Sequence, residues 1–202
     1  MSPALLFVVD DDPSVLNSLS RMLRILGHDV EAFASPRQFL QRPRHPGPAC
    51  LISDLQMPEM SGLEFQQALL AEGHTLPIIF LTGHGDIPTT VKALKAGAVD
   101  FLTKPVASEK LLGSVNTAIQ GHRARLQQMD ALQDLQRRFD RLTPREKQVC
   151  VRVGRGLLNK QIAYELSTAE KTVKLHRSRV MKKMQISSVA ELVDLLRALG
   201  TR

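Results

Sequence analysis

The chain has 202 residues, of which 43% are hydrophobic and 23% charged, and a formal net charge of +7. These proportions exclude a disordered or fibrous chain, and the length suits two domains of ordinary size. Two cysteines, Cys50 and Cys150, are too few for a disulfide framework or a thiolate metal site, and no apolar run approaches the roughly 20 residues of a membrane span. We therefore expect a cytoplasmic protein with no secretory leader and no membrane partner.

The charge is unevenly distributed along the chain. Residues 1–119 carry 9 Lys/Arg against 12 Asp/Glu, whereas residues 143–202 carry 13 against 5. Residues 120–142 lie between these extremes, with 5 against 3. A mildly acidic first part and a strongly basic last part indicate two domains with different partners, the second partner being a polyanion.

Short apolar runs alternate with amphipathic stretches over residues 1–120. The runs typical of buried strands are Leu5–Val9, Val30–Phe33, Cys50–Ser53, Ile78–Leu81 and Val99–Leu102. The amphipathic stretches are Ser14–Leu26, Pro36–Leu40, Gly62–Ala71, Pro88–Ala96 and Ser108–Ile119. Strands that alternate with helices form a parallel sheet covered on both faces, and a barrel needs about 250 residues. This part therefore predicts a doubly wound α/β domain with a five-stranded parallel sheet over residues 1–120.

Residues 121–141 read as a helical linker. The stretch 120–142 contains no proline and no β-branched residue, and its apolar side chains Leu132, Leu135, Phe139 and Leu142 share one helical face. A solvated helix explains this pattern. A coiled-coil seam between two copies is the alternative, although barely two heptads are present.

The strand signal disappears after residue 142. Thr143, Pro144 and Glu146 form the sequence pattern of a capping box, which marks the start of a helix. Further helical stretches are expected near Pro144–Val153, Lys160–Leu166, Ala169–Met184 and Val189–Leu199. Residues 142–202 thus predict an all-α domain of four helices.

Polar residues gather where the predicted strands end. Asp10, Asp11 and Asp12 follow the first strand, Asp54 ends the third, Thr82 ends the fourth, and Lys104 follows the fifth. Ligands of open α/β sheets bind at this edge. Clustered carboxylates need a cation, and Mg²⁺ is the hard divalent ion that oxygen ligands suit. A lysine and a hydroxyl beside such a site suit a phosphoryl group.

These residues resemble the receiver domain of two-component response regulators. The matching segments are residues 7–12, 53–62, 81–86 and 95–105, which occur in the order and at the spacing of that family. The resemblance implies the flavodoxin-like strand order 2-1-3-4-5 and a phosphoryl group transferred from a sensor histidine kinase to Asp54.

The same resemblance implies roles for the surrounding residues. Mg²⁺ would be held by the carboxylates of Asp10, Asp11 and Asp54 and by the backbone carbonyl of Gln56. Thr82 and Lys104 would contact the phosphoryl oxygens, and Phe101 would rotate inward on activation. The side chains of Gln56 and His84 would control how readily water removes the phosphoryl group. Such a receiver is not an enzyme beyond its own phosphoryl transfer and autodephosphorylation.

Two other functions deserve comparison. Asp10 and Asp12 fit the Asp-x-Asp pattern of haloacid-dehalogenase-like phosphatases, but that assignment leaves residues 54–58 unexplained and provides no cap domain. The second is a DNA-binding protein whose receiver is an unphosphorylated scaffold, which the complete Asp, Thr and Lys set disfavours.

The basic last part resembles the helix-turn-helix domain of the LuxR/NarL/FixJ class over residues 142–197. In that class the third of four helices enters the major groove of DNA, and here it corresponds to Glu170–Met184. The DNA contacts implied are Lys160, Lys171, Thr172, Lys174, Leu175, Arg177, Ser178 and Lys182. Lys174, Leu175 and Ser178 would face base edges. Phosphate or mixed contacts would come from Lys160, Lys171, Arg177 and Lys182.

The whole chain therefore resembles a response regulator of the FixJ subgroup. Such a protein is a phosphorylation-controlled transcriptional regulator with a receiver over 1–120, a linker over 121–141 and a DNA-binding domain over 142–202. The implied partners are a sensor histidine kinase, double-stranded promoter DNA, RNA polymerase and a second copy of the chain on phosphorylation.

Overall fold

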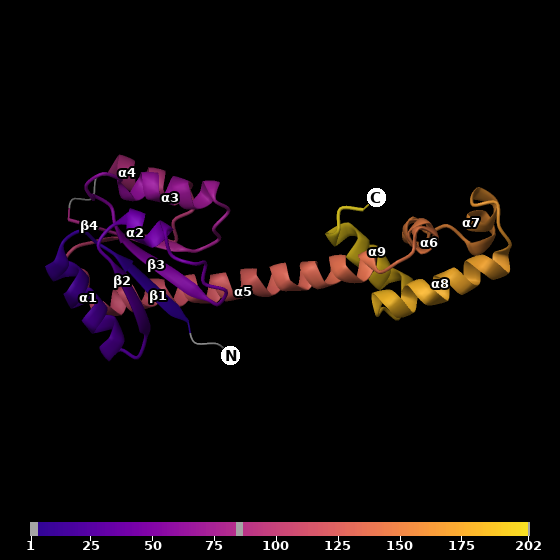
Figure 1. The fold of residues 1–202 in the computed structure, drawn as a ribbon, viewed down its shortest axis with the longest axis horizontal. Helices are drawn as coiled ribbons and strands as arrows, with labels where there is room; N and C mark the ends of the chain where they lie inside the picture. The colour runs from indigo at the N-terminus through magenta and orange to yellow at the C-terminus, as the bar shows by residue number, and fades with distance from the viewer. Residues whose placement is uncertain (1–3, 84–86, 202) are drawn as a thin grey trace. The chain divides into compact units, whose positions relative to one another are not determined.

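The computed structural model describes residues 4–83 and 87–201 of the chain. The chain divides into two compact units, Met1–Leu126 and Gln127–Arg202 (Figure 1). Their boundary falls inside the segment expected to be a linker. None of the helices in the described ranges is both long and apolar enough to cross a membrane.

A five-stranded parallel sheet in the order β2-β1-β3-β4-β5 forms the centre of the first unit. The strands are β1 (Leu5–Val9), β2 (Asp29–Phe33), β3 (Ala49–Asp54), β4 (Ile78–Thr82) and β5 (Asp100–Thr103). The predicted doubly wound fold and its strand order are confirmed. Val9 pairs with Ser53 and Leu81 pairs with Asp54, so that β1, β3 and β4 end at one edge of the sheet.

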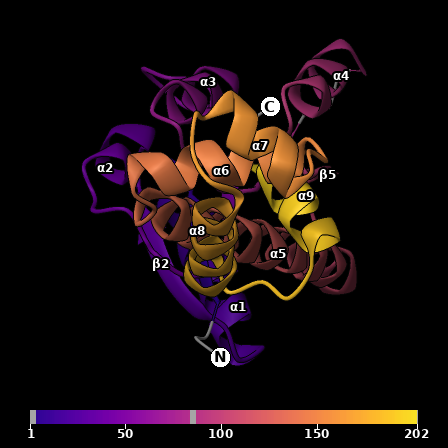
Figure 2. The same ribbon diagram turned by 90° about the vertical axis from the view of Figure 1, so that its right-hand side faces the viewer.

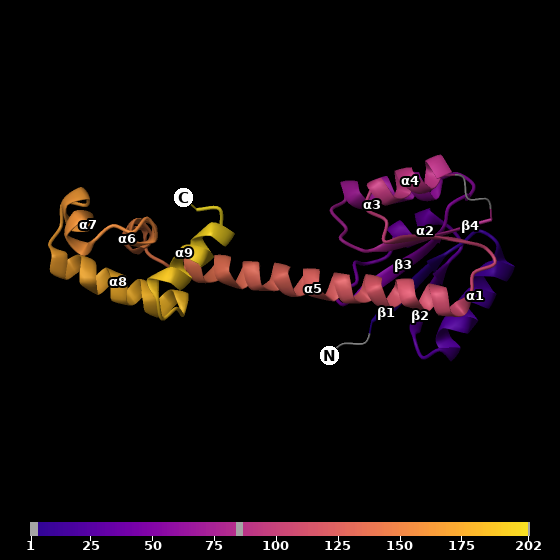
Figure 3. The same cartoon turned by 180° about the vertical axis from the view of Figure 1, so that it is seen from behind.

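Helices cover both faces of this sheet. They are α1 (Pro13–Ile25), α2 (Pro36–Leu40), α3 (Gly62–Ala71), α4 (Ile87–Lys95) and α5 (Ser108–Asp140). Leu6, Val8 and Ile52 pack against α1 and the first half of α5, while the alternate residues Phe7 and Leu51 pack against α2, α3 and α4 (Figure 3). Alternation along each strand therefore divides the buried side chains between two cores, as a period of two residues requires.

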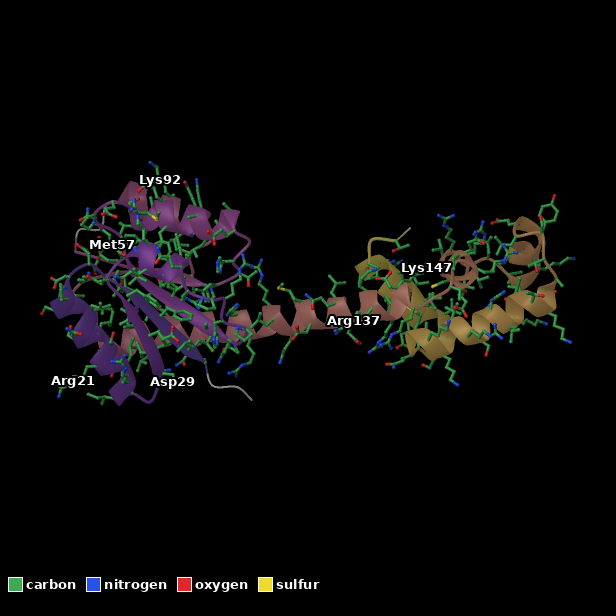
Figure 4. All side chains as sticks on the ribbon, viewed as in Figure 1. Arg21, Asp29, Met57, Lys92, Arg137 and Lys147 are labelled. Carbon is green, nitrogen blue, oxygen red and sulfur yellow. The ribbon has the colours of Figure 1, made fainter. Side chains whose placement is uncertain are left out.

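Helix α5 continues without a break through the segment expected to be a separate linker. No proline or β-branched residue between 120 and 142 interrupts its backbone. Leu135 is 6% exposed and packs with Phe139 and Leu142 in the core of the second unit, whereas Leu132 is 46% exposed. Lys147, labelled in Figure 4, lies over the Phe139 ring, with its Nζ 5.0 Å from the ring centre. The C-terminal part of the apolar stripe thus belongs to the core of this unit, while Leu132 remains in solvent, and the choice between a solvated helix and a coiled-coil seam for residues 121–134 stays a prediction.

The second unit completes its core with helices α6 (Pro144–Gly154), α7 (Asn159–Glu165), α8 (Glu170–Met184) and α9 (Val189–Ala198), seen in Figure 2. The all-α, four-helix prediction for this region is confirmed. Thr143 caps α6 as expected: its backbone N–H donates to Glu146 Oε2 at 2.8 Å, and the Glu146 N–H donates to Thr143 Oγ1 at 3.3 Å. Val173, Val180 and Met184 are the buried face of α8. The opposite face of α8 is therefore free to meet a partner.

Candidate functional site

The sheet brings four polar side chains of the first unit to one edge. Asp10 directly follows β1, Asp54 and Thr82 are the last residues of β3 and β4, and Lys104 directly follows β5. Because β1, β3, β4 and β5 are neighbours in the sheet, their carboxyl ends converge. Asp10, Asp54 and Thr82 are nearly inaccessible to solvent, at 2%, 7% and 1% exposure. The residues expected at a phosphoryl site thus lie together.

Lys104 joins the two buried carboxylates. Its Nζ donates to Asp10 Oδ2 and to Asp54 Oδ1, each at 2.6 Å. The remaining oxygens also accept hydrogen bonds, Asp10 Oδ1 from the backbone N–H of Asp12 at 3.0 Å and Asp54 Oδ2 from that of Gln56 at 2.8 Å. Every carboxylate oxygen therefore has a donor, which holds both side chains in place. The peptide bond after Lys104, to Pro105, is cis.

Burial and charge act in opposite directions on these groups. Burial raises the pKa of the Asp10 carboxyl, and the hydrogen bond and charge of Lys104 only partly offset this effect. Burial alone lowers the pKa of the Lys104 ammonium, but its hydrogen bonds and attraction to Asp10 and Asp54 outweigh burial and raise it overall. Lys104 therefore remains protonated at neutral pH, where it compensates one of the two buried negative charges.

The donor set at this edge fits Mg²⁺. Asp10 and Asp54 present only oxygen atoms, and with Lys104 they retain one net negative charge, to which the exposed Asp11 adds another. Within residues 4–83 and 87–201, no three His, Cys, Asp or Glu side chains converge on one point as a closed metal cage does. Mg²⁺ does not need such a cage, since it commonly binds one or two carboxylates and keeps several waters. Asp12 has a separate task, because its Oδ1 accepts from the Ser14 N–H and caps α1.

Of the other residues expected here, Phe101 lies half-buried against the core beneath α2, α3 and α4. The side chain of Gln56 is exposed. His84, the second residue expected to control access of water, falls outside the described residues.

Gly62 lies in close contact with the end of β3. A Cβ at this position would lie 2.8 Å from the Asp54 carbonyl oxygen and 2.8 Å from Phe80 Cε1. The Gly62 N–H also donates to the carbonyl of Leu55 at 2.8 Å. The loop after β3 therefore leaves no room for a side chain.

We expect Gly62→Ala to destabilise the protein by about 1–3 kcal/mol, since neither a backbone oxygen nor a packed ring can yield to the new methyl group. The urea midpoint measures this change. Gly113→Ala is the matched control, because a Cβ there meets nothing within 4 Å and alanine favours the helix by up to about 1 kcal/mol. Equal midpoints for the two variants would contradict the close contact.

A basic, exposed face of α8 forms the candidate nucleic-acid interface in the second unit. Five of the predicted contacts on this helix are exposed: Lys171, Lys174, Leu175, Ser178 and Lys182. Lys174 is paired only with Glu170, at 3.3 Å and in solvent, where ion pairs contribute little. These side chains can therefore reorient toward DNA.

Two predicted contacts lie away from this face. Thr172 is half-buried, and the half-buried Arg177 donates from Nη1 to Asn159 Oδ1 at 3.2 Å. Arg177 thus ties α8 to the start of α7, where the exposed Lys160 also lies. This contact supports a role for Arg177 in positioning α7 and α8 relative to each other.

The sequence analysis did not name two exposed residues of this unit, one on α8 and one on α7. Arg179 is exposed and follows Leu175 by four residues, so that helical periodicity places it on the same face. Tyr164, the single tyrosine of the chain, is 88% exposed on α7. A fully exposed aromatic ring on the first helix of a helix-turn-helix pair was a signal available from the predicted helix spacing.

Comparisons with known proteins assign a family to each of the two units. Residues 6–116 match the response regulator receiver domain, and residues 140–196 match the bacterial regulatory proteins of the luxR family. The chain is 45% identical to the response regulator protein TodT of Pseudomonas putida over 94% of this chain and 84% of that protein. It is 45% identical to nodulation protein W of Bradyrhizobium diazoefficiens over 98% and 87%. Among solved structures, the response regulator StyR matches 97% of this chain and 99% of its own, with 45% identity and a TM-score of 0.87.

Proposed function

The chain belongs to the response regulators, and we propose that Asp54 is its phosphoacceptor. It combines a receiver domain with a LuxR-type DNA-binding domain, and its function is therefore phosphorylation-controlled regulation of transcription. The phosphoryl donor in this proposal is the phosphohistidine of a sensor kinase. The observation that carries the assignment is the placement of Asp54 at a strand end, with its carboxylate hydrogen-bonded to Lys104. Thr82, at the end of the next strand, places a hydroxyl-bearing side chain at the same edge.

The transfer proceeds by attack of an Asp54 carboxylate oxygen on phosphorus as the bond from phosphorus to the histidine nitrogen breaks. Asp10, Asp11 and Asp54, with the backbone carbonyl of Gln56, are the ligands we propose for Mg²⁺. When bound, the metal neutralises negative charge on the phosphoryl oxygens. Lys104 supplies a second positive charge, because its ammonium already contacts the Asp54 carboxylate. The chain catalyses no reaction in this scheme besides its own phosphorylation and autodephosphorylation.

Phosphorylation adds negative charge next to Thr82 and Lys104 and so changes the forces on the ends of β4 and β5. The ring of Phe101, on β5, is half-buried against the core, and in this proposal it rotates inward on activation. We propose that these shifts reshape the α4–β5 face, that two receivers then dimerise, and that the paired α8 helices occupy two half-sites of promoter DNA. The scheme places the protein in the cytoplasm, with RNA polymerase as a further partner.

Phosphorylation should tighten DNA binding by the full-length protein. The measurement is fluorescence anisotropy on a labelled operator selected from a random-sequence pool, with and without acetyl phosphate and Mg²⁺, across a series of salt concentrations. We expect the phosphorylated form to bind more tightly, because two linked half-site contacts multiply only in the dimer. Equal affinity of both forms, at concentrations where the unphosphorylated protein is monomeric, would refute the coupling and leave the DNA-binding assignment standing.

Two lysine variants separate base recognition from phosphate contacts. Lys174→Ala should weaken binding to the selected operator by about 1–3 kcal/mol and relax the sequence preference at one position. Lys160→Ala should weaken binding to all sequences alike and reduce the salt slope by about one phosphate contact. Arg21→Ala, on the exposed surface of α1 (Figure 4), removes the same charge from the receiver and should leave DNA binding unchanged. An identical loss for all three variants would show that net charge alone controls binding.

A further inference from the structure

The receiver contains a cavity at the end of the sheet opposite Asp54. Its volume is about 420 Å³, within the range of small-molecule sites. The walls come from α3, from the segment that leads into β4, from the turn before β5, and from α5. All of these segments lie within the first unit, and none of their residues belongs to the phosphoryl site described above.

Most of the cavity wall is apolar. Leu69, Leu76 and Ile78 line it, and two further lining residues, Leu70 and Val99, are 54% and 36% exposed. Apolar side chains that surround a hollow and remain partly in water favour a ligand with an apolar body, since such a ligand removes their surface from water. Gly121 adds open space, because a Cβ built on it meets nothing within 4 Å.

The polar groups of the cavity favour an anion. Arg125 and His74 line it, and His122 lies between them and the sheet, with its Nδ1 3.0 Å from the Ala49 backbone. Burial is the main cause that lowers the pKa of both His74 and His122, and nearby arginines lower it further. These arginines are Arg42 and Arg44 for His74 and Arg125 for His122, while the carboxylate of Glu72, 3.4 Å from His74 Nε2, acts in the opposite direction. Even when both histidines are neutral, the charges of these arginines give the surroundings of the cavity a net positive charge.

Gln66 lines the cavity with a side-chain amide that is held in place from behind. Its side chain is 2% exposed, and its Nε2 donates to the backbone carbonyls of Ala96 at 3.1 Å and Ala93 at 3.5 Å. These two acceptors fix the orientation of the amide, since a flipped amide would bring oxygen against oxygen. Its buried Oε1 then has no hydrogen-bond partner in the described part of the chain. This oxygen is closed off from the cavity as well as from solvent, so the amide serves to tie α3 to the end of α4 rather than to meet a ligand.

We propose that this cavity binds a small organic acid. The ligand carries a carboxylate for Arg125 and an apolar body for the leucine and isoleucine wall. Binding links α3, the turn before β5 and α5, and it requires neither Mg²⁺ nor phosphorylation of Asp54.

The test uses the unphosphorylated full-length protein with 4-hydroxybenzoate and 6-hydroxyhexanoate as probes. Both carry a carboxylate and a hydroxyl on an apolar body, one aromatic and one aliphatic. The measurement is two-dimensional NMR of the ¹⁵N-labelled protein, in which the backbone amides of Gly97 and Gly121 report on the cavity. We expect at least one probe to shift these two signals saturably and to leave the amide signal of Asp54 in place. No saturable shift with either probe would overturn the proposal.

A matched pair of glycine variants locates the site. Gly121→Leu fills the cavity and should abolish the shift at Gly97, whereas Gly113→Leu, on the same helix and equally open to a side chain, should bind as the wild type does. Both substitutions replace an exposed helical glycine by a good helix former, so that the fold is retained. Equal binding by both variants would place the probes elsewhere and refute the assignment.

The ligand chemistry is tested separately. Arg125→Gln should weaken binding about tenfold, because it removes a charge-assisted hydrogen bond to the carboxylate. Benzoate and hexanoate, which keep the carboxylate and the apolar body, should compete with the hydroxylated probes for the same site. Inorganic phosphate that binds as tightly as the organic acids, or binding that Arg125→Gln leaves unchanged, would overturn the organic-acid assignment.

Discussion

Asp54→Asn should abolish phosphorylation of the full-length protein by acetyl phosphate and Mg²⁺. The amide is nearly the same size as the carboxylate but lacks the anionic oxygen that attacks phosphorus, so the gain of one phosphoryl mass should fall from near one per chain to none. Intact-mass spectrometry measures the outcome. The loss of the negative charge opposite Lys104 also leaves that ammonium with Asp10 as its single carboxylate partner among the contacts described above.

The control for this variant is Asp12→Asn. Asp12 lies on the loop after β1, at the same edge of the sheet as Asp54, but it is exposed and caps α1, and asparagine caps helices equally well. Asp12→Asn should therefore be phosphorylated as the wild type is. Stable, stoichiometric phosphorylation of Asp54→Asn would assign the phosphoacceptor to another side chain. Loss of phosphorylation in both variants would indicate damage to the loop instead.

Lys183→Met should destabilise the second unit by about 2 kcal/mol. The carboxylate of Glu146, whose side chain is 3% exposed, accepts from Lys183 Nζ at 2.6 Å. Removal of one partner of a fully buried ion pair costs about 3–5 kcal/mol. We expect a smaller loss, about 2 kcal/mol, because Lys183 is 37% exposed and solvent screens part of the interaction. Urea unfolding followed by circular dichroism measures the change. Lys147→Met is the control, since its pair with Asp140 is exposed and should contribute less than about 1 kcal/mol.

The pH dependence of this effect has a definite sign. Burial raises the pKa of the Glu146 carboxyl, but hydrogen bonds from Lys183 and Thr143 outweigh burial and lower it overall. The resulting stability is fully present above the unfolded-state pKa, about 4.3, and is lost as pH falls through the lower folded-state value. In Lys183→Met burial raises the pKa, so the difference in stability between wild type and variant should shrink from pH 7 to pH 4. A difference that is constant with pH would mean that Glu146 and Lys183 do not interact as an ion pair.

The edge of the sheet illustrates what could be predicted from sequence. Asp10, Asp54, Thr82 and Lys104 each end or follow an apolar run, and parallel strands with helical crossovers bring their carboxyl ends to one edge. The bridge from Lys104 to both carboxylates was not predictable, because it depends on the rotamers of three side chains from three strands. Gly62 appeared only as the start of a helix, although its close approach to Asp54 is apparent once β3 and β4 are packed.

Helix α8 shows the same limit on what the sequence can predict. Periodicity placed Lys171, Lys174, Leu175, Ser178 and Lys182 on one face, which the structure leaves exposed. The resemblance to the LuxR/NarL/FixJ class implied a DNA contact for Arg177, but this side chain bonds to Asn159 on a neighbouring helix. A charge alone does not specify a direction in space, and only the packing of α7 against α8 gives one.

Local periodicity and strand-end chemistry by themselves determined the two-domain organisation, the order of elements and the residues gathered at the phosphoryl edge, since these follow from contacts between near neighbours and from rules of handedness. Tertiary structure alone decided where the stripe from Leu132 to Leu142 packs, which partner compensates Glu146, and which wall residues enclose the cavity beside Gln66. The physical reason is that these features depend on side chains distant in sequence. Their burial and pairing are properties of the assembled core, which no local pattern encodes.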